Sequence, residues 1–282
     1  MGMPSAAAVG SLSKDVAWYR KDLPSDISEM RKVLEEYSGI PPDSVDKHVK
    51  EVRDKAWEVY PYGSVGMFGF LSLNMPNFKV FPEILERVKS GEKLLDIGCC
   101  FAQELRLLAY HGAPSENLLG ADLHGGFMDV GYDLFLDRNK LKSRFIVADL
   151  FDETSSLYEW NGAMDIIHAS SFFHLFSWEQ QVAACKRCVQ LLRPRSGSLI
   201  VGRQAGNINA GEYARDGGRG SRYRHDATSW ARLWEQVGDE TNSKWKVDAS
   251  LEMEGYFEAE GRFADWQKDT SRRLVFCVRR EE

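Results

Sequence analysis

Acidic residues stand at the ends of successive short apolar segments, where strand patterns give way to turns. The first segment, 94–97, carries Asp96 and runs into Gly98 and then into a helical pattern that begins near residue 102. Gly98 would let the backbone approach a ligand closely, and the free N–H groups at the start of the helix would point toward that ligand. Because the complete G-x-G-x-x-G pattern is missing, this turn alone predicts only a nucleotide-type cradle.

Two more carboxylates and a polar turn follow along the chain. Asp122 ends the next apolar segment, about two dozen residues beyond the glycine, where a doubly wound sheet meets the hydroxyls of a bound ribose. Asp149 ends the third segment and could accept a hydrogen bond from an adenine amine, with Leu150 and Phe151 beside the ring. A fourth segment ends in the polar-aromatic turn 168–174. One acidic strand end is commonly a helix cap or a solvated side chain, but this series predicts a ligand along a sheet edge.

Strand and helix patterns alternate over the middle of the chain, which predicts a parallel sheet covered by helices. We expect strands at 93–97, 117–122, 143–148, 163–168 and 198–202, and helices at 102–111, 125–138, 153–160 and 178–192. The remaining elements are a long mobile loop over 203–225, a helix over 228–237 capped by Asp226, and two final strands near 245–252 and 273–279, with Gly255 and Gly261 in the turn between them.

A helical extension is expected before the first strand. Apolar residues at helical spacing predict helices over 26–37, with Ser25 as N-cap, and over 44–60, followed by a short helix over 81–88. The aromatic, glycine-rich segment 60–71 suits a loop that closes over a flat or apolar ligand. Aromatic packing of the same segment against the core is an equally good interpretation.

Composition excludes several classes of protein. Of the 282 residues, 43% are hydrophobic and 28% charged, as in an ordinary soluble globular protein. The net charge of −6, without a long basic run, disfavours nucleic-acid binding. The absence of an 18-residue apolar run or a signal-peptide pattern predicts a cytoplasmic protein with no membrane partner. Five cysteines, Cys185 and Cys188 included, are expected to be ordinary thiols, with no metal site.

In combination, the motifs resemble class I S-adenosylmethionine-dependent methyltransferases. The segment 96–98 matches the family's first motif, Asp122 its second, Asp149 its third, 165–175 its fourth, and 191–201 the entry to its fifth strand. The resemblance implies an α/β fold with a doubly wound, Rossmann-like sheet of seven strands in the order 3-2-1-4-5-7-6, the last strand antiparallel. It also implies three parts: a disordered segment 1–13, a helical lid or substrate-binding extension 14–90, and an S-adenosylmethionine-binding domain 91–282.

A narrower resemblance points to fungal secondary-metabolite methyltransferases of meroterpenoid and pyrone-polyene pathways. The segments that carry it are 96–100, 112–120, 131–138 and 148–152. It implies methylation of a carboxylate or an acidic hydroxyl on a largely apolar polyketide or terpenoid intermediate. Cys100 and Ala102 depart from the family, because glycines usually stand there, and the turn is therefore expected to be less permissive.

The resemblance also implies which residues form the site. The expected contacts to S-adenosylmethionine are Tyr62, Asp96, Gly98, Cys99, Cys100, Gln103, Asp122, Leu123, Asp149, Leu150, Phe151 and Ala169. The expected substrate contacts are Phe68, Phe173 and Gln204.

Catalytic needs depend on the acceptor. A carboxylate needs no base because it is ionised near pH 7, whereas a phenol or enol would benefit from one, most simply a histidine. His174 lies beyond the fourth strand and is the candidate base, with ligand shaping or packing as the alternative; His168 is expected to be structural. Arg203 could hold an acceptor carboxylate in a bidentate contact or pair with a surface acid.

Two other classes compete with this interpretation. An NAD(P)-dependent Rossmann oxidoreductase would require a fuller glycine pattern and a sheet without the closing hairpin. A non-catalytic partner subunit would have no need of Asp122 and Asp149. The acceptor and the oligomeric state stay open, although the helices over 26–37 and 44–60 could form a lid or the face of a homodimer.

Overall fold

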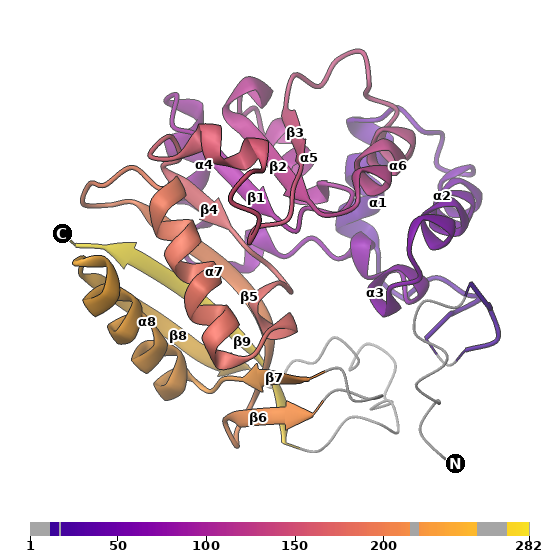
Figure 1. The fold of residues 1–282 in the computed structure, drawn as a ribbon. Coiled ribbons are helices and arrows are strands. Elements are labelled where there is room, and N and C mark those ends of the chain that lie inside the picture. The colour runs from indigo at the N-terminus through magenta and orange to yellow at the C-terminus, as the bar shows by residue number, and fades with distance from the viewer. Residues whose placement is uncertain (1–11, 17, 215–219, 253–269, 282) are drawn as a thin grey trace.

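A seven-stranded sheet organises the computed structural model, which describes residues 12–16, 18–214, 220–252 and 270–281 (Figure 1). Its strands are β1 (Leu94–Ile97), β2 (Leu118–Asp122), β3 (Arg144–Val147), β4 (Ile166–His168), β5 (Leu199–Asn207), β8 (Trp245–Glu252) and β9 (Ser271–Arg280). The order is β3-β2-β1-β4-β5-β9-β8; β1 to β5 are parallel, and β9 runs antiparallel to β5 and β8. When only the strands of this sheet are numbered in chain order, β8 is the sixth and β9 the seventh. The predicted order 3-2-1-4-5-7-6 is therefore confirmed.

Helices cover both faces of the sheet, because its central strands are apolar on both sides. On one face lie α1 (Ser28–Glu36), α2 (Val45–Val59), α4 (Phe81–Lys89), α5 (Gln103–Tyr110) and α6 (Gly125–Phe135). On the other lie α7 (Trp178–Leu191) and α8 (Ala227–Thr241). Each face has its own hydrophobic core, and the carboxyl ends of β1 to β4 meet along one edge between them.

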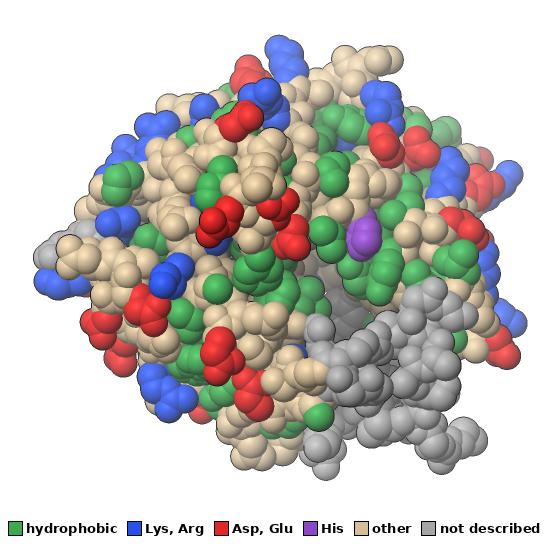
Figure 2. Space-filling view, viewed as in Figure 1, with side chains coloured by type: hydrophobic (Ala, Val, Ile, Leu, Met, Phe, Trp, Pro, Cys, Tyr) green, Lys and Arg blue, Asp and Glu red, His purple; other side chains and the backbone are tan. Residues whose placement is uncertain are grey.

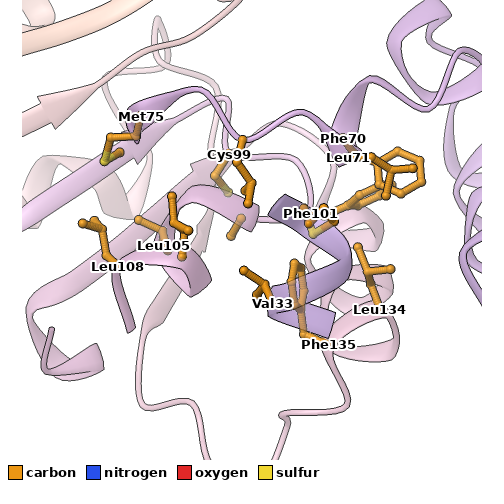
Figure 3. Packing of buried hydrophobic residues seen from close by; sticks show 14 of the residues in the cluster. Val33, Phe70, Leu71, Met75, Cys99, Phe101, Leu105, Leu108, Leu134 and Phe135 are labelled. Carbon is orange, nitrogen blue, oxygen red and sulfur yellow. The ribbon is translucent and has the colours of Figure 1, made fainter. Parts of the chain in front are cut away.

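The extension shares the core of the first face. Figure 3 shows Val33 of α1 and Phe135 of α6 in the same packed cluster as Phe101. A buried ion pair reinforces this contact: Arg106 Nε and Nη2 donate to Asp137 at 2.9 and 3.0 Å. Tyr37 Oη, at the end of α1, donates to the same carboxylate at 2.9 Å. The domain boundary at residue 90 stays a prediction, since apolar packing is continuous across it.

Two helix starts test the predicted caps. Ser25 is not the N-cap of α1, because the helix begins after Ile27 and Asp26 Oδ1 instead accepts the Ser28 N–H at 2.9 Å. The Asp226 prediction is confirmed: its carboxylate accepts the Ser229 N–H at 2.7 Å at the start of α8.

The prediction of a mobile loop over 203–225 is wrong for the residues of this segment that the structure describes. β5 continues to Asn207 because its backbone pairs with β9 as far as Ser271. The chain then forms a two-stranded hairpin of β6 (Gly211–Ala214) and β7 (Ser221–Arg224). Polar side chains misled the prediction, since backbone pairing does not require apolar residues.

Shorter segments also differ from expectation. In place of a helix over 153–160 there is one 3-10 turn, η5 (Ser156–Trp160), preceded by a turn in which Asp152 accepts the Thr154 N–H at 2.8 Å. Segment 60–71, expected as a loop, contains the short helices α3 (Gly63–Gly66) and η2 (Gly69–Leu71). The other short elements are η3 (Met75–Asn77), η4 (Ser115–Asn117) and η6 (Phe173–Leu175).

Some expectations fall outside the described residues. These are the disorder expected over 1–13, apart from residues 12 and 13, and the turn with Gly255 and Gly261. Within the described ranges, no helix has the length and apolar character needed to cross a membrane. The same ranges contain no group of three histidine, cysteine or acidic residues placed to hold a metal.

Candidate functional site

The turn after β1 packs against the end of β2 and against Phe172, which follows β4. The N–H groups of Gly98 and Cys99 both donate to the Ala121 carbonyl oxygen, at 2.8 and 3.1 Å. Gly98 has a φ of +70°, and a Cβ added there would lie 3.0 Å from the ring of Phe172. Both conformation and space therefore favour glycine here. The Cys99 side chain is buried in the core, so a ligand contact from this residue falls to its backbone.

The two residues that replace family glycines adopt the backbone conformation that glycine favours. Cys100 has a φ of +51° and Ala102 a φ of +50°, both in the left-handed region. Each costs about 1–2 kcal/mol in a non-glycine residue. The Cys100 N–H is held by Asp122 Oδ2 at 2.9 Å, and the Ala102 N–H by the Cys99 carbonyl oxygen at 2.6 Å. The turn thus keeps its shape despite the substitutions and stores strain at the predicted ligand site.

Asp122 fixes this turn to the end of β2. Its Oδ2 accepts the Cys100 N–H, and its Oδ1 accepts the His124 N–H at 3.0 Å. Burial raises the pKa of the Asp122 carboxyl, against the effect of these two hydrogen bonds. A carboxylate has about four lone-pair sites, so it can still accept hydrogen bonds from two ligand hydroxyls.

Apolar side chains are exposed on either side of this carboxylate. Leu123 is 56% exposed after β2, and Phe151 is 39% exposed after β3. Asp149 is exposed, and its Oδ1 accepts the Phe151 N–H at 2.9 Å, whereas Leu150 is buried. Figure 2 shows acidic and hydrophobic side chains gathered around a hollow on this face. Leu123 and Phe151 thus follow the neighbouring strands β2 and β3, and their contact with an adenine ring stays a prediction, whereas Leu150 belongs to the core.

The aromatic segment of the extension reaches the same place. The Tyr60 ring stacks on His124 at 5.1 Å, and the Tyr62 ring contacts Phe127 at 5.7 Å. Burial and the nearby Asp122 carboxylate raise the pKa of Tyr62 to about 12, so its hydroxyl is neutral. Phe68 lies elsewhere: it is 1% exposed, with the Arg53 guanidinium 4.3 Å from its ring centre. The expected substrate contact of Phe68 is therefore corrected, because its ring belongs to the core.

The segment after β4 closes over the Gly98 turn. Ala169 is fully buried and its N–H donates to the Val201 carbonyl oxygen at 2.9 Å, so its expected contact with the cofactor is corrected. Phe172 contacts the turn, as described above. Phe173 is fully buried between Trp230 and Phe276, with ring centroids 5.5 and 6.1 Å away. The predicted substrate contact of Phe173 is corrected for the same reason as that of Phe68.

A buried chain of hydrogen bonds joins β1 to the end of β4. His168 Nδ1 lies 2.7 Å from Asp96 Oδ1, and His168 Nε2 lies 2.8 Å from Ser170 Oγ. Asp96 and His168 are register partners on adjacent strands and are almost fully buried. Ser170 is half-buried, at the sheet edge.

Charged groups on several elements face His168. Burial alone would lower the pKa of His168, but the Asp96 and Glu104 carboxylates raise it above its ordinary value, against the opposing charge of Arg203. Glu104 belongs to α5 and accepts the N–H groups of Asn74 and Met75 at 2.6 and 3.2 Å. The extension, the first-motif helix and β5 thus all contribute to the environment of this imidazole.

Other predicted site residues lie in η6, along β5 and in the first turn of α5. The Ala205 N–H donates to His174 Nδ1 at 3.4 Å, and Arg203 is buried on β5 beside Val275 of β9. Gln204 is 2% exposed, and neither Nε2 nor Oε1 of its amide has a hydrogen-bond partner among the described residues. The same is true of Oε1 of Gln103. Both amides are therefore suited to groups that a ligand would supply.

Sequence reasoning missed the hydrogen bonds that join His168 to Asp96 and to Ser170. The available signal was the parallel pairing of the first and fourth strands, which puts a histidine beside the first-motif aspartate. Ser170 follows two residues later and had no distinguishing pattern of its own.

Comparisons with known proteins agree with this geometry. Residues 18–71 match a family described as the meroterpenoid methyltransferase N-terminal domain, and residues 94–195 match a methyltransferase domain. The chain is 54% identical over 280 residues to O-methyltransferase phiE of Fungal sp. (strain ATCC 74256), covering 95% of this chain and 93% of that protein. It is 42% identical to O-methyltransferase atr3 of Stereocaulon alpinum, covering 95% and 77%.

A solved structure supports the fold independently. The CurJ carbon methyltransferase superposes with a TM-score of 0.51 at 17% identity, covering 90% of this chain and 67% of that one.

Proposed function

We propose that this chain, which belongs to the S-adenosylmethionine-dependent O-methyltransferases of fungal secondary metabolism, methylates a carboxylate or an acidic hydroxyl on a polyketide or terpenoid intermediate. The alternative of an NAD(P)-dependent oxidoreductase is not supported, since the matching family models and the relatives named above are methyltransferases. Relatives named as enzymes likewise argue against a non-catalytic partner subunit.

The residues at the sheet edge fit S-adenosylmethionine. Asp122 is placed to accept hydrogen bonds from the ribose hydroxyls, and Leu123 and Phe151 to flank the adenine. We expect the Tyr62 hydroxyl and the turn that holds Cys100 to border the methionine end, since Asp122 lies close to both. When bound, the cofactor supplies a methyl group on a positively charged sulfur. The protein's own part is to align the acceptor oxygen with that methyl group and to exclude water.

The single observation that carries the acceptor proposal is the unpartnered Gln204 amide at the ligand end of β5. It favours a polar acceptor, because burying an amide without partners costs about 1–3 kcal/mol, and the relatives named O-methyltransferases favour oxygen as its methylated atom. Arg203 is the proposed carboxylate anchor beside it. His174 stays the candidate base, but the Ala205 N–H occupies its Nδ1 lone pair at 3.4 Å, so His174 would have to release this bond to accept a proton.

Replacing Gln204 by methionine is expected to have opposite effects on stability and activity. Unfolding free energy should rise by about 1–2 kcal/mol, because an unsatisfied amide is replaced by a thioether of similar volume. The KM for the acceptor should rise about tenfold, through the loss of one hydrogen bond. Urea unfolding and steady-state kinetics measure both; a drop in stability would show that the amide already has a partner.

An acceptor panel tests the proposed function. Methyl-labelled S-adenosylmethionine would be incubated with phenolic, enolic and carboxylic polyketides and terpenoids, using wild type and His174→Ala. Transfer to such acceptors supports the proposal, and transfer to none of them rejects it. An unimpaired His174→Ala enzyme would remove His174 as the base, whereas a large loss of turnover on hydroxyl acceptors alone would support it.

The proposal extends to the setting of the enzyme. We place it in the cytoplasm, acting on a small molecule without a nucleic-acid or membrane partner, in keeping with its net charge of −6. The exposed sides of α1 and α2 are the proposed face of a homodimer, which sedimentation would test.

A further inference from the structure

We infer that the helical extension is part of the cofactor site, because it holds the strained turn after β1 in the conformation that binds S-adenosylmethionine. The main connection is Glu104 in the first turn of α5, which acts as a positioning residue for this turn. The inference goes beyond the proposed reaction, since it concerns how the cofactor is bound and not which acceptor is methylated. It gives the extension a second role besides that of a lid or substrate-binding part.

The turn needs support from other segments, because its own residues disfavour its shape. Cys100 and Ala102 have φ values of +51° and +50°. In a non-glycine residue this left-handed conformation is disfavoured by about 5- to 30-fold. Ala102 is also the N-cap of α5, and its side chain makes no hydrogen bond to the start of the helix. Asp122 holds one side of the turn through the Cys100 N–H, and the extension holds the other.

Glu104 joins the extension to the helix that follows the turn. Its carboxylate is buried and accepts the Asn74 N–H at 2.6 Å and the Met75 N–H at 3.2 Å. Both N–H groups belong to the start of η3, where helical hydrogen bonding leaves donors without an internal partner. Because Glu104 is only two residues beyond Ala102, its two hydrogen bonds fix the beginning of α5 relative to the extension.

An aromatic ring of the extension packs against the turn itself. Phe70 belongs to η2 and is buried, and its ring meets the Phe101 ring edge to face with 4.6 Å between the centroids. Figure 3 shows the two rings in neighbouring positions within the packed cluster. Phe101 is fully buried and stands between the two left-handed residues of the turn. A contact with its ring therefore restrains the backbone on both sides.

A third contact comes from α1 through the buried ion pair. Arg106 Nη1 donates to the Phe101 carbonyl oxygen at 2.8 Å, while its other nitrogens bind Asp137. Asp137 in turn accepts the Tyr37 hydroxyl at the end of α1. The extension thus reaches the turn from α1, η2 and η3. These contacts lie in the core beneath the turn, so they do not depend on a bound acceptor.

The effect on cofactor affinity follows from the populations of the turn. When a ligand binds only one conformation, its apparent affinity falls in proportion to the fraction of molecules in that conformation. Weakening a contact from the extension should therefore weaken cofactor binding, although the changed residue does not touch the cofactor. Glycine at position 102 adopts the left-handed conformation without strain, so in that background the same change should matter less.

A double-mutant cycle of Glu104→Gln and Ala102→Gly is the direct test, with calorimetric titration of S-adenosylhomocysteine as the measurement. Glutamine keeps the shape of the side chain but only one acceptor oxygen, so one of the two N–H groups loses its partner. Glu104→Gln should weaken binding by about tenfold with alanine at position 102, and by at most about threefold with glycine there. Glu51→Gln, which removes an exposed contact with Lys47 on α2, is the matched control and should bind as wild type does.

Phe70→Leu tests the inference through a different contact and decides it where Glu104→Gln does not fold. It should also weaken S-adenosylhomocysteine binding, and Ala102→Gly should reduce that loss in the same way. Urea unfolding of each variant shows whether the protein is folded under the conditions of the titration. A general loss of structure would not be rescued, because glycine at position 102 does not restore the missing contact.

Two results would overturn the inference. One is unchanged affinity in the folded Glu104→Gln and Phe70→Leu variants, and the other is an equal loss with alanine and with glycine at position 102. No titration requires an acceptor. A wild-type enzyme that binds S-adenosylhomocysteine but methylates neither carboxylates nor hydroxyls would therefore reject the proposed function and leave the role of the extension intact.

Discussion

Replacing Asp122 by alanine is expected to weaken S-adenosylmethionine binding by about 10²–10³-fold, because charge-assisted hydrogen bonds to both ribose hydroxyls disappear. The change also removes the acceptor of the Cys100 N–H, at 2.9 Å, and of the His124 N–H, at 3.0 Å. The bond from the Cys100 N–H to Asp122 holds Cys100 in its strained left-handed conformation. Without this bond the turn after β1 should relax in the variant. Calorimetric titration with S-adenosylhomocysteine would measure the loss.

Asp133→Asn is the matched control for this prediction. Its carboxylate contacts Lys55 Nζ at 2.8 Å on the exposed surface of α6, away from the turn. The affinity of Asp133→Asn for S-adenosylhomocysteine should stay within about twofold of wild type, because an exposed ion pair contributes little. Unchanged affinity in Asp122→Ala would show that the cofactor does not lie across the end of β2.

Removing the Asp137 charge should produce the largest loss of stability. Asp137→Asn leaves the fully buried Arg106 guanidinium without its bidentate carboxylate, which is expected to cost about 3–5 kcal/mol of unfolding free energy. The Tyr37 hydroxyl and Arg106 then compete for the one oxygen that the asparagine amide keeps. Because Arg106 Nη1 also donates to the Phe101 carbonyl oxygen, between Cys100 and Ala102, cofactor affinity should fall as well.

Urea unfolding of Asp137→Asn and of a surface counterpart makes the comparison. Asp129→Asn removes a pair with Arg138, 3.1 Å apart, in which both side chains are more than half exposed. That variant should lose less than about 1 kcal/mol. Equal losses of unfolding free energy in the two variants would mean that the buried pair of Arg106 and Asp137 does not link the extension to the turn after β1.

The sheet and the cofactor residues could be predicted because each has a local signal. Alternating apolar segments place β1 to β5, and the acidic residues that end them mark one edge. Asp122 was found this way, and the structure puts it beside Gly98 through the Cys100 N–H. The antiparallel hairpin at the other edge followed from the family resemblance and is confirmed.

Features that depend on tertiary pairing could not be predicted. Nothing in the sequence around Arg203 shows that β5 continues to Asn207, because its partner on β9 is more than sixty residues away. Phe68 and Phe173 had the composition of ligand contacts, but they pack against Arg53 of α2 and Trp230 of α8, which the residues around them do not predict. The same holds for His168, whose environment requires four separate elements.

Carbon NMR of the product formed with ¹³C-methyl S-adenosylmethionine tests the central claim most directly, because the chemical shift identifies the atom that received the methyl group. With a polyketide or terpenoid acceptor from the panel, we predict a single labelled signal in the O-methyl range, absent with Asp122→Ala at limiting cofactor. A label on carbon or nitrogen, or full labelling by Asp122→Ala, would contradict the account.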